Sequence, residues 1–165
     1  MTDWYTDELF DCGQEQLVFP VSRLVCDPER FRKDADESMS AVGMGAVYTR
    51  CSDCSPLRRV TPEERESLLR RWYDPHHRAL NGMTAERLNT FGCCLIIDAH
   101  SFYPTALPYE LHGAEMYRPD ICIGTDIFHT PREIFDTAEA HFTAAGQSCT
   151  RARFCHMRSS VRCSA

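Results

Sequence analysis

The sequence predicts an α/β domain, and two observations carry this prediction. Short segments rich in valine and aromatic residues, typical of strands, alternate along the chain with segments whose apolar residues have helical spacing. The chain has 165 residues, of which 43% are hydrophobic and 25% charged, so one domain with a sizeable core is expected. Strands that alternate with helices favour a layered domain with a mixed, at least partly parallel sheet.

The first half contains two strand candidates and one well-marked helix start. We interpret Leu17–Val25 and Gly45–Thr49 as short strands because they are apolar and β-prone. Thr61 is followed by Pro62 and, three residues after the cap, by Glu64. This is the pattern of a capping box, so we expect a helix that begins at Pro62.

The second half alternates in the same way. We expect Pro75 to interrupt the first helix and a second helical segment to follow it. The five apolar residues Cys93–Ile97 are bounded by turn formers and predict a buried, central strand. The segment DICIGTD, residues 120–126, predicts another strand, and Thr130 repeats the capping pattern ahead of a helix over residues 132–145.

The composition changes after Gly146. Residues 147–165 contain four arginines, four serines and three cysteines but no acidic residue. One interpretation is a basic, disordered tail that binds an anionic partner. The other, which we favour, is that the reading frame is lost near Gly146. We therefore assign residues 1–146 to the folded domain and residues 147–165 to an aberrant, disordered tail.

Charge, hydropathy and cysteine spacing exclude several classes of protein. The net charge is −6 and no basic stripe precedes the tail, which argues against nucleic-acid binding. The apolar runs are too short to cross a bilayer, and the first residues do not form a secretory signal. The CxxC pair at Cys51 and Cys54 has no second pair at zinc-site spacing. We predict a cytoplasmic protein with reduced thiols that binds neither nucleic acid nor membranes.

Several polar residues lie where a site would form. His100 follows the predicted central strand, and ligands of open α/β sheets bind at the carboxyl ends of strands. The alternative is a histidine at the rim of the core that bonds to a backbone carbonyl. Asp3 and Asp7 have i, i+4 spacing, so both could lie on one helix face of a site. The alternative is a solvated acidic helix. Arg23 and Arg30 suit a carboxylate ligand, although surface salt bridges are the commoner role of arginines.

Seven segments in order along residues 1–146 resemble the N-formylglutamate amidohydrolase family. They are TDWYTDELF, FPVSRLVCDPERF, GMGAVYTR, WYDPHHRAL, LIIDAHSF, LPYE and RPDICIGTD with the following FHTP. The resemblance implies a three-layer α/β fold like that of the zinc carboxypeptidases, with one zinc ion at the strand ends. It also implies hydrolysis of the formyl amide of N-formyl-L-glutamate to formate and glutamate, a step in histidine degradation.

The resemblance assigns roles to individual residues. Asp3 and His100 would be zinc ligands, and Asp98 would orient the site from behind them. Zinc held by protein ligands keeps an open position for water and lowers the pKa of that water. Arg23 and Arg30 match the segment that would hold the carboxylates of the substrate.

Two further residues are assigned to the site. His77 is the last histidine of a Pro-x-His element and would contact the substrate. Glu110, in LPYE, is the carboxylate that we assign as the catalytic base, in place of the usual base of the family, which we expect to be missing.

The chain also departs from the family pattern. Family members begin upstream of Met1 with a Pro-His-Ser motif that supplies a histidine ligand, and they continue past Gly146 to a strand that bears a glutamate base. We therefore expect an incomplete fold, truncated at both ends, that is weakly active or inactive. The alternatives are a zinc amidase or peptidase acting on another acyl-amino acid or peptide, a non-catalytic binding module, and a truncated fragment without function.

Overall fold

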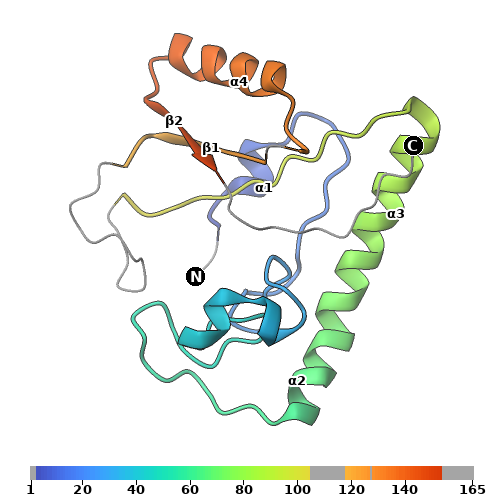
Figure 1. Cartoon of the computed structure of the whole chain (residues 1–165), viewed down its shortest axis with the longest axis vertical. Helices are drawn as coiled ribbons and strands as arrows, with labels where there is room; N and C mark the ends of the chain where they lie inside the picture. Colours follow the sequence, from blue (N-terminus) through green and yellow to red (C-terminus); the bar gives the residue numbers. More distant parts are fainter. Residues whose placement is uncertain (1–2, 105–117, 127, 154–165) are drawn as a thin grey trace. The chain divides into compact units, whose positions relative to one another are not determined.

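The computed structural model describes residues 3–104, 118–126 and 128–153 (Figure 1). The chain forms two compact units, Met1–Glu115 and Met116–Ala165, and each is described by itself.

The long helix of the first unit has three consecutive parts. They are α2 (Pro62–Leu68), the π-helical turn η3 (Leu69–Tyr73) and α3 (Asp74–Phe91), and Figure 1 shows them as one continuous rod. The expected interruption at Pro75 does not occur. In η3 the backbone N–H of Asp74 bonds to the carbonyl of Leu69, five residues earlier. Pro75 then occupies the first turn of α3, and the change of bonding pattern just before it accommodates a residue that has no N–H.

The predicted start of this helix is confirmed. The Thr61 hydroxyl accepts a hydrogen bond from the backbone N–H of Glu64 at 3.2 Å, and the Glu64 carboxylate accepts one from the N–H of Thr61 at 2.8 Å. We expect Thr61→Ala to lower the free energy of unfolding of the first unit by about 1 kcal/mol. Urea unfolding followed by far-ultraviolet circular dichroism measures this loss. Ser67→Ala, at an exposed position inside α2, is the control and should cause no loss.

The core of the first unit lies where α2 and η3 pack against irregular chain. The cluster contains Cys26, Ala46, Val47, Leu69 and Tyr73. Phe19, Val60, Leu68 and Trp72 pack around it. Two short 3-10 turns, η1 (Asp34–Asp36) and η2 (Ser38–Val42), lie between the two irregular segments that supply the other side of the core.

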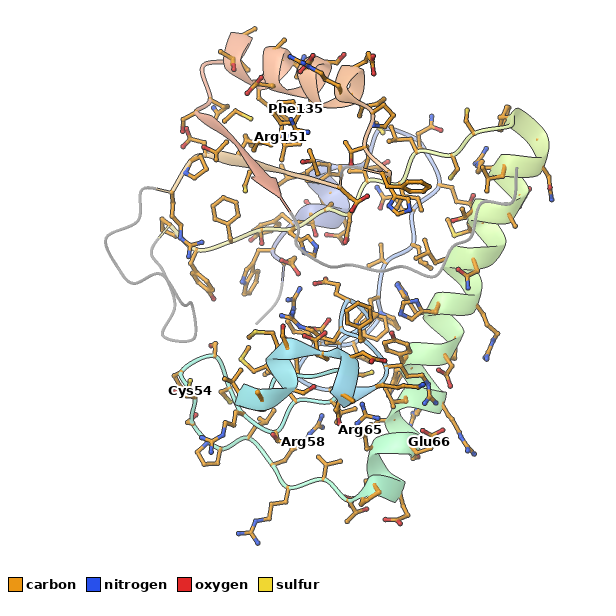
Figure 2. All side chains as sticks on the ribbon, viewed as in Figure 1. Cys54, Arg58, Arg65, Glu66, Phe135 and Arg151 are labelled. Atoms are coloured by element: carbon orange, nitrogen blue, oxygen red, sulfur yellow. The ribbon has the colours of Figure 1, made fainter. Side chains whose placement is uncertain are left out.

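The strands expected over Leu17–Val25 and Gly45–Thr49 do not form. The second segment is buried as its composition predicts, and Tyr48 is 0% exposed. However, the guanidinium of Arg58 (labelled in Figure 2) donates to the carbonyl of Tyr48 at 3.0 Å and to that of Val25 at 2.8 Å. A side chain thus satisfies carbonyls that strand pairing would otherwise use, and Gly45–Thr49 is buried without forming a ladder.

The prediction of a buried central strand at Cys93–Ile97 is wrong for this structure. Leu95, Ile96 and Ile97 are 55–65% exposed, and within the described residues no backbone hydrogen bond to another strand is formed here. The apolar run has the composition of a strand, but a strand also needs neighbours that exchange backbone hydrogen bonds with it.

The second unit contains β1 (Ile121–Thr125), α4 (Arg132–Ala144) and β2 (Cys149–Arg153). The two strands pair in parallel, with Ile121 opposite Cys149, and α4 packs on this sheet (Figure 1). Phe135 of α4 is 6% exposed, and the guanidinium carbon of Arg151 lies 4.5 Å from the centre of its ring (Figure 2).

These elements agree in part with the predicted fold class. Helices and strands are mixed, and the sheet is a small, open, parallel pair, which is compatible with α/β. The three-layer, zinc-carboxypeptidase-like arrangement stays a prediction. The strand at 120–126 and the helix from 132 are found as expected, although Thr130 does not cap α4 and instead accepts a hydrogen bond from the N–H of Asp126.

The segment after Gly146 differs locally from the expectation of irregular structure. Cys149–Arg153 forms β2, and the rest of that segment, residues 154–165, lies outside the described residues. None of the helices in the described part of the chain has the length and apolar character that crossing a membrane requires.

Candidate metal centre

Two segments far apart in the sequence are joined by a reciprocal pair of hydrogen bonds. The N–H of Trp4 donates to the Ser101 hydroxyl at 2.9 Å, and the N–H of Ser101 donates to Oδ1 of Asp3 at 3.0 Å. Asp3 lies just before α1 (Thr6–Leu9), and Ser101 follows His100 directly. This joint therefore places the Asp3 carboxylate beside the His100 ring.

Glu29 completes a cluster of three ligand-type side chains. Nδ1 of His100 lies 3.7 Å from Oδ1 of Asp3 and 3.5 Å from Oε1 of Glu29. One ligand atom from each of the three residues lies within 4.8 Å of the others. On the far side of the ring, Nε2 of His100 lies 3.3 Å from Oδ1 of Asp98. The imidazole thus has carboxylates at both nitrogens, and Nδ1 faces the cluster.

Arg23 binds both carboxylates of the cluster. Its Nη2 donates to Oδ2 of Asp3 and, at 3.1 Å, to Oε1 of Glu29. Its Nη1 lies 4.0 Å from Oδ2 of Asp27. Arg23 therefore neutralises part of the negative charge of the cluster and fixes the orientation of its two carboxylates.

Arg30 lies near carboxylates without bonding to them. Its Nε is 3.6 Å from Oδ2 of Asp27, and its Nη1 is 3.9 Å from Oε1 of Glu37. Both separations are longer than a hydrogen bond, and Nε is buried without a hydrogen-bond partner. The guanidinium of Arg30 also interacts with the hydroxyl of Tyr48, which itself bonds to Asp27.

Asp27 connects the loop that carries Glu29 to the core. Its carboxylate is 0% exposed, accepts a hydrogen bond from the Tyr48 hydroxyl at 2.7 Å and accepts another from the N–H of Glu29 at 3.1 Å. One buried carboxylate thus links the core to the loop that carries Glu29.

The carboxylates of the cluster are balanced by two positive charges, the proton of His100 and the guanidinium of Arg23. Hydrogen bonds to Asp3 and Asp98 raise the pKa of His100 to about 10. Burial would raise the pKa of Asp3, but hydrogen bonds from His100 and Ser101 and the charge of Arg23 hold it at about 2. Burial raises the pKa of Glu29 to about 7. A metal ion would have to displace the proton of His100 and would offset the cost of burying the Glu29 carboxylate.

The donor set fits zinc. One imidazole and two carboxylates are ligands that zinc accepts, and three protein ligands are the number typical of a catalytic zinc site with an open position. The ring nitrogen away from the cluster faces a carboxylate, which is the usual environment of a metal-binding histidine.

Most of the residues assigned from the sequence lie in or beside this cluster. Asp3 and His100 belong to it, and Asp98 and Arg23 contact its members. His77 does not reach it. Nε2 of His77 lies 2.9 Å from the carbonyl oxygen of Pro28, and its ring packs on Tyr73 with the ring centres 4.2 Å apart. Asp7 is exposed in α1, so the helix face expected to carry Asp3 and Asp7 together does not exist. Glu110 lies outside the described residues.

The sequence analysis missed Glu29 and Asp27. Both lie in the segment Asp27-Pro28-Glu29-Arg30, which has no helical or strand periodicity, so no pattern predicted which way the carboxylates point. One feature of the sequence does point to them: both acidic residues lie between Arg23 and Arg30, the two arginines assigned to the substrate carboxylates.

Comparison with family models places the chain in a known family. The model described as N-formylglutamate amidohydrolase matches residues 1–154, which extends past the change of composition at Gly146. No curated protein and no solved structure matches the chain. With nearly its whole length matched by this model, the chain belongs to the N-formylglutamate amidohydrolase family, a family of hydrolases that act on an amide.

Proposed function

We propose that this protein is a zinc-dependent hydrolase that cleaves the formyl amide of N-formyl-L-glutamate. Water is consumed, the bond between the formyl carbon and nitrogen breaks, and formate and glutamate are released. The observation that carries the proposal is the convergence of Asp3, Glu29 and His100 in a chain of this family. The family resemblance implies two protein ligands, Asp3 and His100, and we propose Glu29 as the third because it lies beside them.

We assign metal-binding and positioning roles to five residues. Asp3, Glu29 and His100 would hold the zinc ion, which when bound lowers the pKa of water and polarises a carbonyl. Asp98 faces Nε2 of His100 and keeps Nδ1 turned towards the cluster. Arg23 holds the carboxylates of Asp3 and Glu29 in place, so the metal ligands need little reorganisation.

The substrate carries two carboxylates and needs cationic partners. Arg30 is suited to bind one of them, because its guanidinium hydrogen-bonds to neither Asp27 nor Glu37. Arg23 would contribute its remaining donor capacity to the second. Glu110 is proposed as the base that takes a proton from water and passes it to the leaving nitrogen. We propose that the reaction serves histidine degradation in the cytoplasm, a compartment that keeps cysteines reduced.

Metal removal tests the proposal directly. The protein is depleted with a chelator, dialysed, and assayed for formate release from N-formyl-L-glutamate before and after one equivalent of Zn²⁺ is added. The activity expected from the sequence is weak, and we expect it to disappear on depletion and to return with Zn²⁺. Undiminished hydrolysis by protein shown to contain no metal would exclude the zinc mechanism. Faster hydrolysis of N-acetyl- or peptidyl-glutamate would support the alternative of an amidase for another acyl-amino acid.

A further inference from the structure

The loop that carries Glu29 has neither helix nor strand to fix its position. Residues 27–30 lie between irregular segments. Two internal bonds set the local turn, one from the N–H of Glu29 to Oδ1 of Asp27 and one from the N–H of Arg30 to the carbonyl of Asp27. A ligand on such a loop needs external contacts to hold its carboxylate close to His100. Arg23 and the Asp27–Tyr48 pair supply some of these contacts, and the long helix supplies two more.

Two side chains of the helix bind the carbonyls on either side of Glu29. The hydroxyl of Tyr73 donates to the carbonyl of Arg30 at 2.9 Å, and Nε2 of His77 lies 2.9 Å from the carbonyl of Pro28. A carbonyl oxygen only accepts hydrogen bonds, so the proton of His77 must be on Nε2. The residues before and after Glu29 are thus both attached to the same helix.

The two side chains pack against each other. Tyr73 and His77 are four residues apart, so their rings lie one above the other on one helix face, with ring centres 4.2 Å apart. Tyr73 is 9% exposed and packs in the core cluster with Leu69 and Cys26. The helix therefore connects the Glu29 loop to the core of the first unit.

We propose that Tyr73 and His77 are positioning residues that hold Glu29 in the metal centre, an inference that rests on the proposed zinc site. His77, which the family resemblance assigns to substrate binding, then acts through the backbone of Pro28. Loss of either hydrogen bond lets the loop relax, and Glu29 moves away from His100 while the core of the first unit stays folded.

The test compares zinc affinity among variants of the full chain. His77→Leu removes the donor, and His77→Gln keeps an N–H close to the position of Nε2. By isothermal titration with Zn²⁺ we expect His77→Leu to bind about 10- to 100-fold more weakly than the unmodified protein, as is typical for residues that orient metal ligands. His77→Gln should restore most of this loss, and Tyr73→Phe should weaken binding in the same direction.

His76→Leu is the matched control. His76 is the neighbouring imidazole on the same helix and packs edge-on against Phe19, with ring centres 5.2 Å apart. We expect this variant to change the midpoint of urea unfolding about as much as His77→Leu does while leaving zinc affinity unchanged. Equal losses of zinc affinity in the two variants would show that only general packing is involved and would overturn the proposal.

A double-mutant cycle with Glu29→Gln identifies the route of the effect. If His77 acts through Glu29, then His77→Leu should weaken zinc binding no further once Glu29 is replaced. Fully additive losses would overturn the proposal while leaving the zinc site itself intact. If the unmodified protein binds no zinc at all, both the proposed function and this inference are wrong, so the two failures can be told apart.

Discussion

Replacing His100 by alanine is expected to lower zinc affinity by more than about 100-fold and to abolish hydrolysis of N-formyl-L-glutamate. His100 is the only nitrogen ligand of the cluster, and it faces both Asp3 and Glu29. Residues that merely orient a metal ligand contribute about 10- to 100-fold, so loss of the ligand itself should exceed that range. Titration with Zn²⁺ and the absorption spectrum of the Co²⁺-substituted protein measure the loss independently of activity.

His129→Ala is the control for this prediction. The side chain of His129 is 47% exposed against 35% for His100, and its Nδ1 also bonds to a carboxylate, Oδ1 of Asp126, at 2.8 Å. It lies in the second unit and belongs to no three-residue group of this kind within the described residues. Metal affinity should be unchanged. Retention of tight zinc binding by His100→Ala would show that the metal centre lies elsewhere.

Replacing Asp27 by alanine is expected to lower the free energy of unfolding of the first unit by about 3–5 kcal/mol. The carboxylate is 0% exposed, and its removal leaves the Tyr48 hydroxyl without its partner. It also removes from each of the Arg23 and Arg30 guanidinium groups the one neighbouring carboxylate that is fully buried. Urea unfolding monitored by tryptophan fluorescence and by circular dichroism measures the effect.

Two companion variants separate charge from hydrogen bonding. Tyr48→Phe removes one hydrogen bond to Asp27 and should have a smaller effect, about 1–3 kcal/mol. Asp53→Ala removes an exposed carboxylate that bonds only to Ser55 among the described residues, and it should leave the unfolding midpoint of the first unit nearly unchanged. A loss for Asp27→Ala no larger than that for Asp53→Ala would contradict the anchoring role of Asp27.

The helices were predictable because their signals are local. Thr61, Pro62 and Glu64 determine the start of α2 within four residues, and the capping box is formed as expected. The strands were less predictable, because a strand depends on partners elsewhere in the chain. Gly45–Thr49 is buried but forms no strand, because Arg58 binds one of its carbonyls. Cys93–Ile97 is largely exposed despite its apolar composition.

The candidate site likewise combines residues that could be predicted with residues whose position depends on distant parts of the chain. Asp3 and His100 were assigned from the family resemblance, and their proximity depends on hydrogen bonds that join Trp4 and Ser101 across most of the first unit. Glu29 could not be predicted because it lies in an irregular loop. Tyr73 and His77, which bond to this loop, are more than forty residues away in the sequence. No spacing rule predicts a contact of that kind.

The π-helical turn Leu69–Tyr73 has a consequence for how this chain tolerates changes of length. A π turn is equivalent to one residue inserted into an α-helix, and one residue corresponds to a rotation of about 100° around the helix axis. Deleting a single residue there would leave an unbroken α-helix of ordinary appearance, yet it would turn every side chain of α3 away from its present neighbours. The number of residues in this turn, more than their identity, therefore decides which face of α3 meets the Glu29 loop.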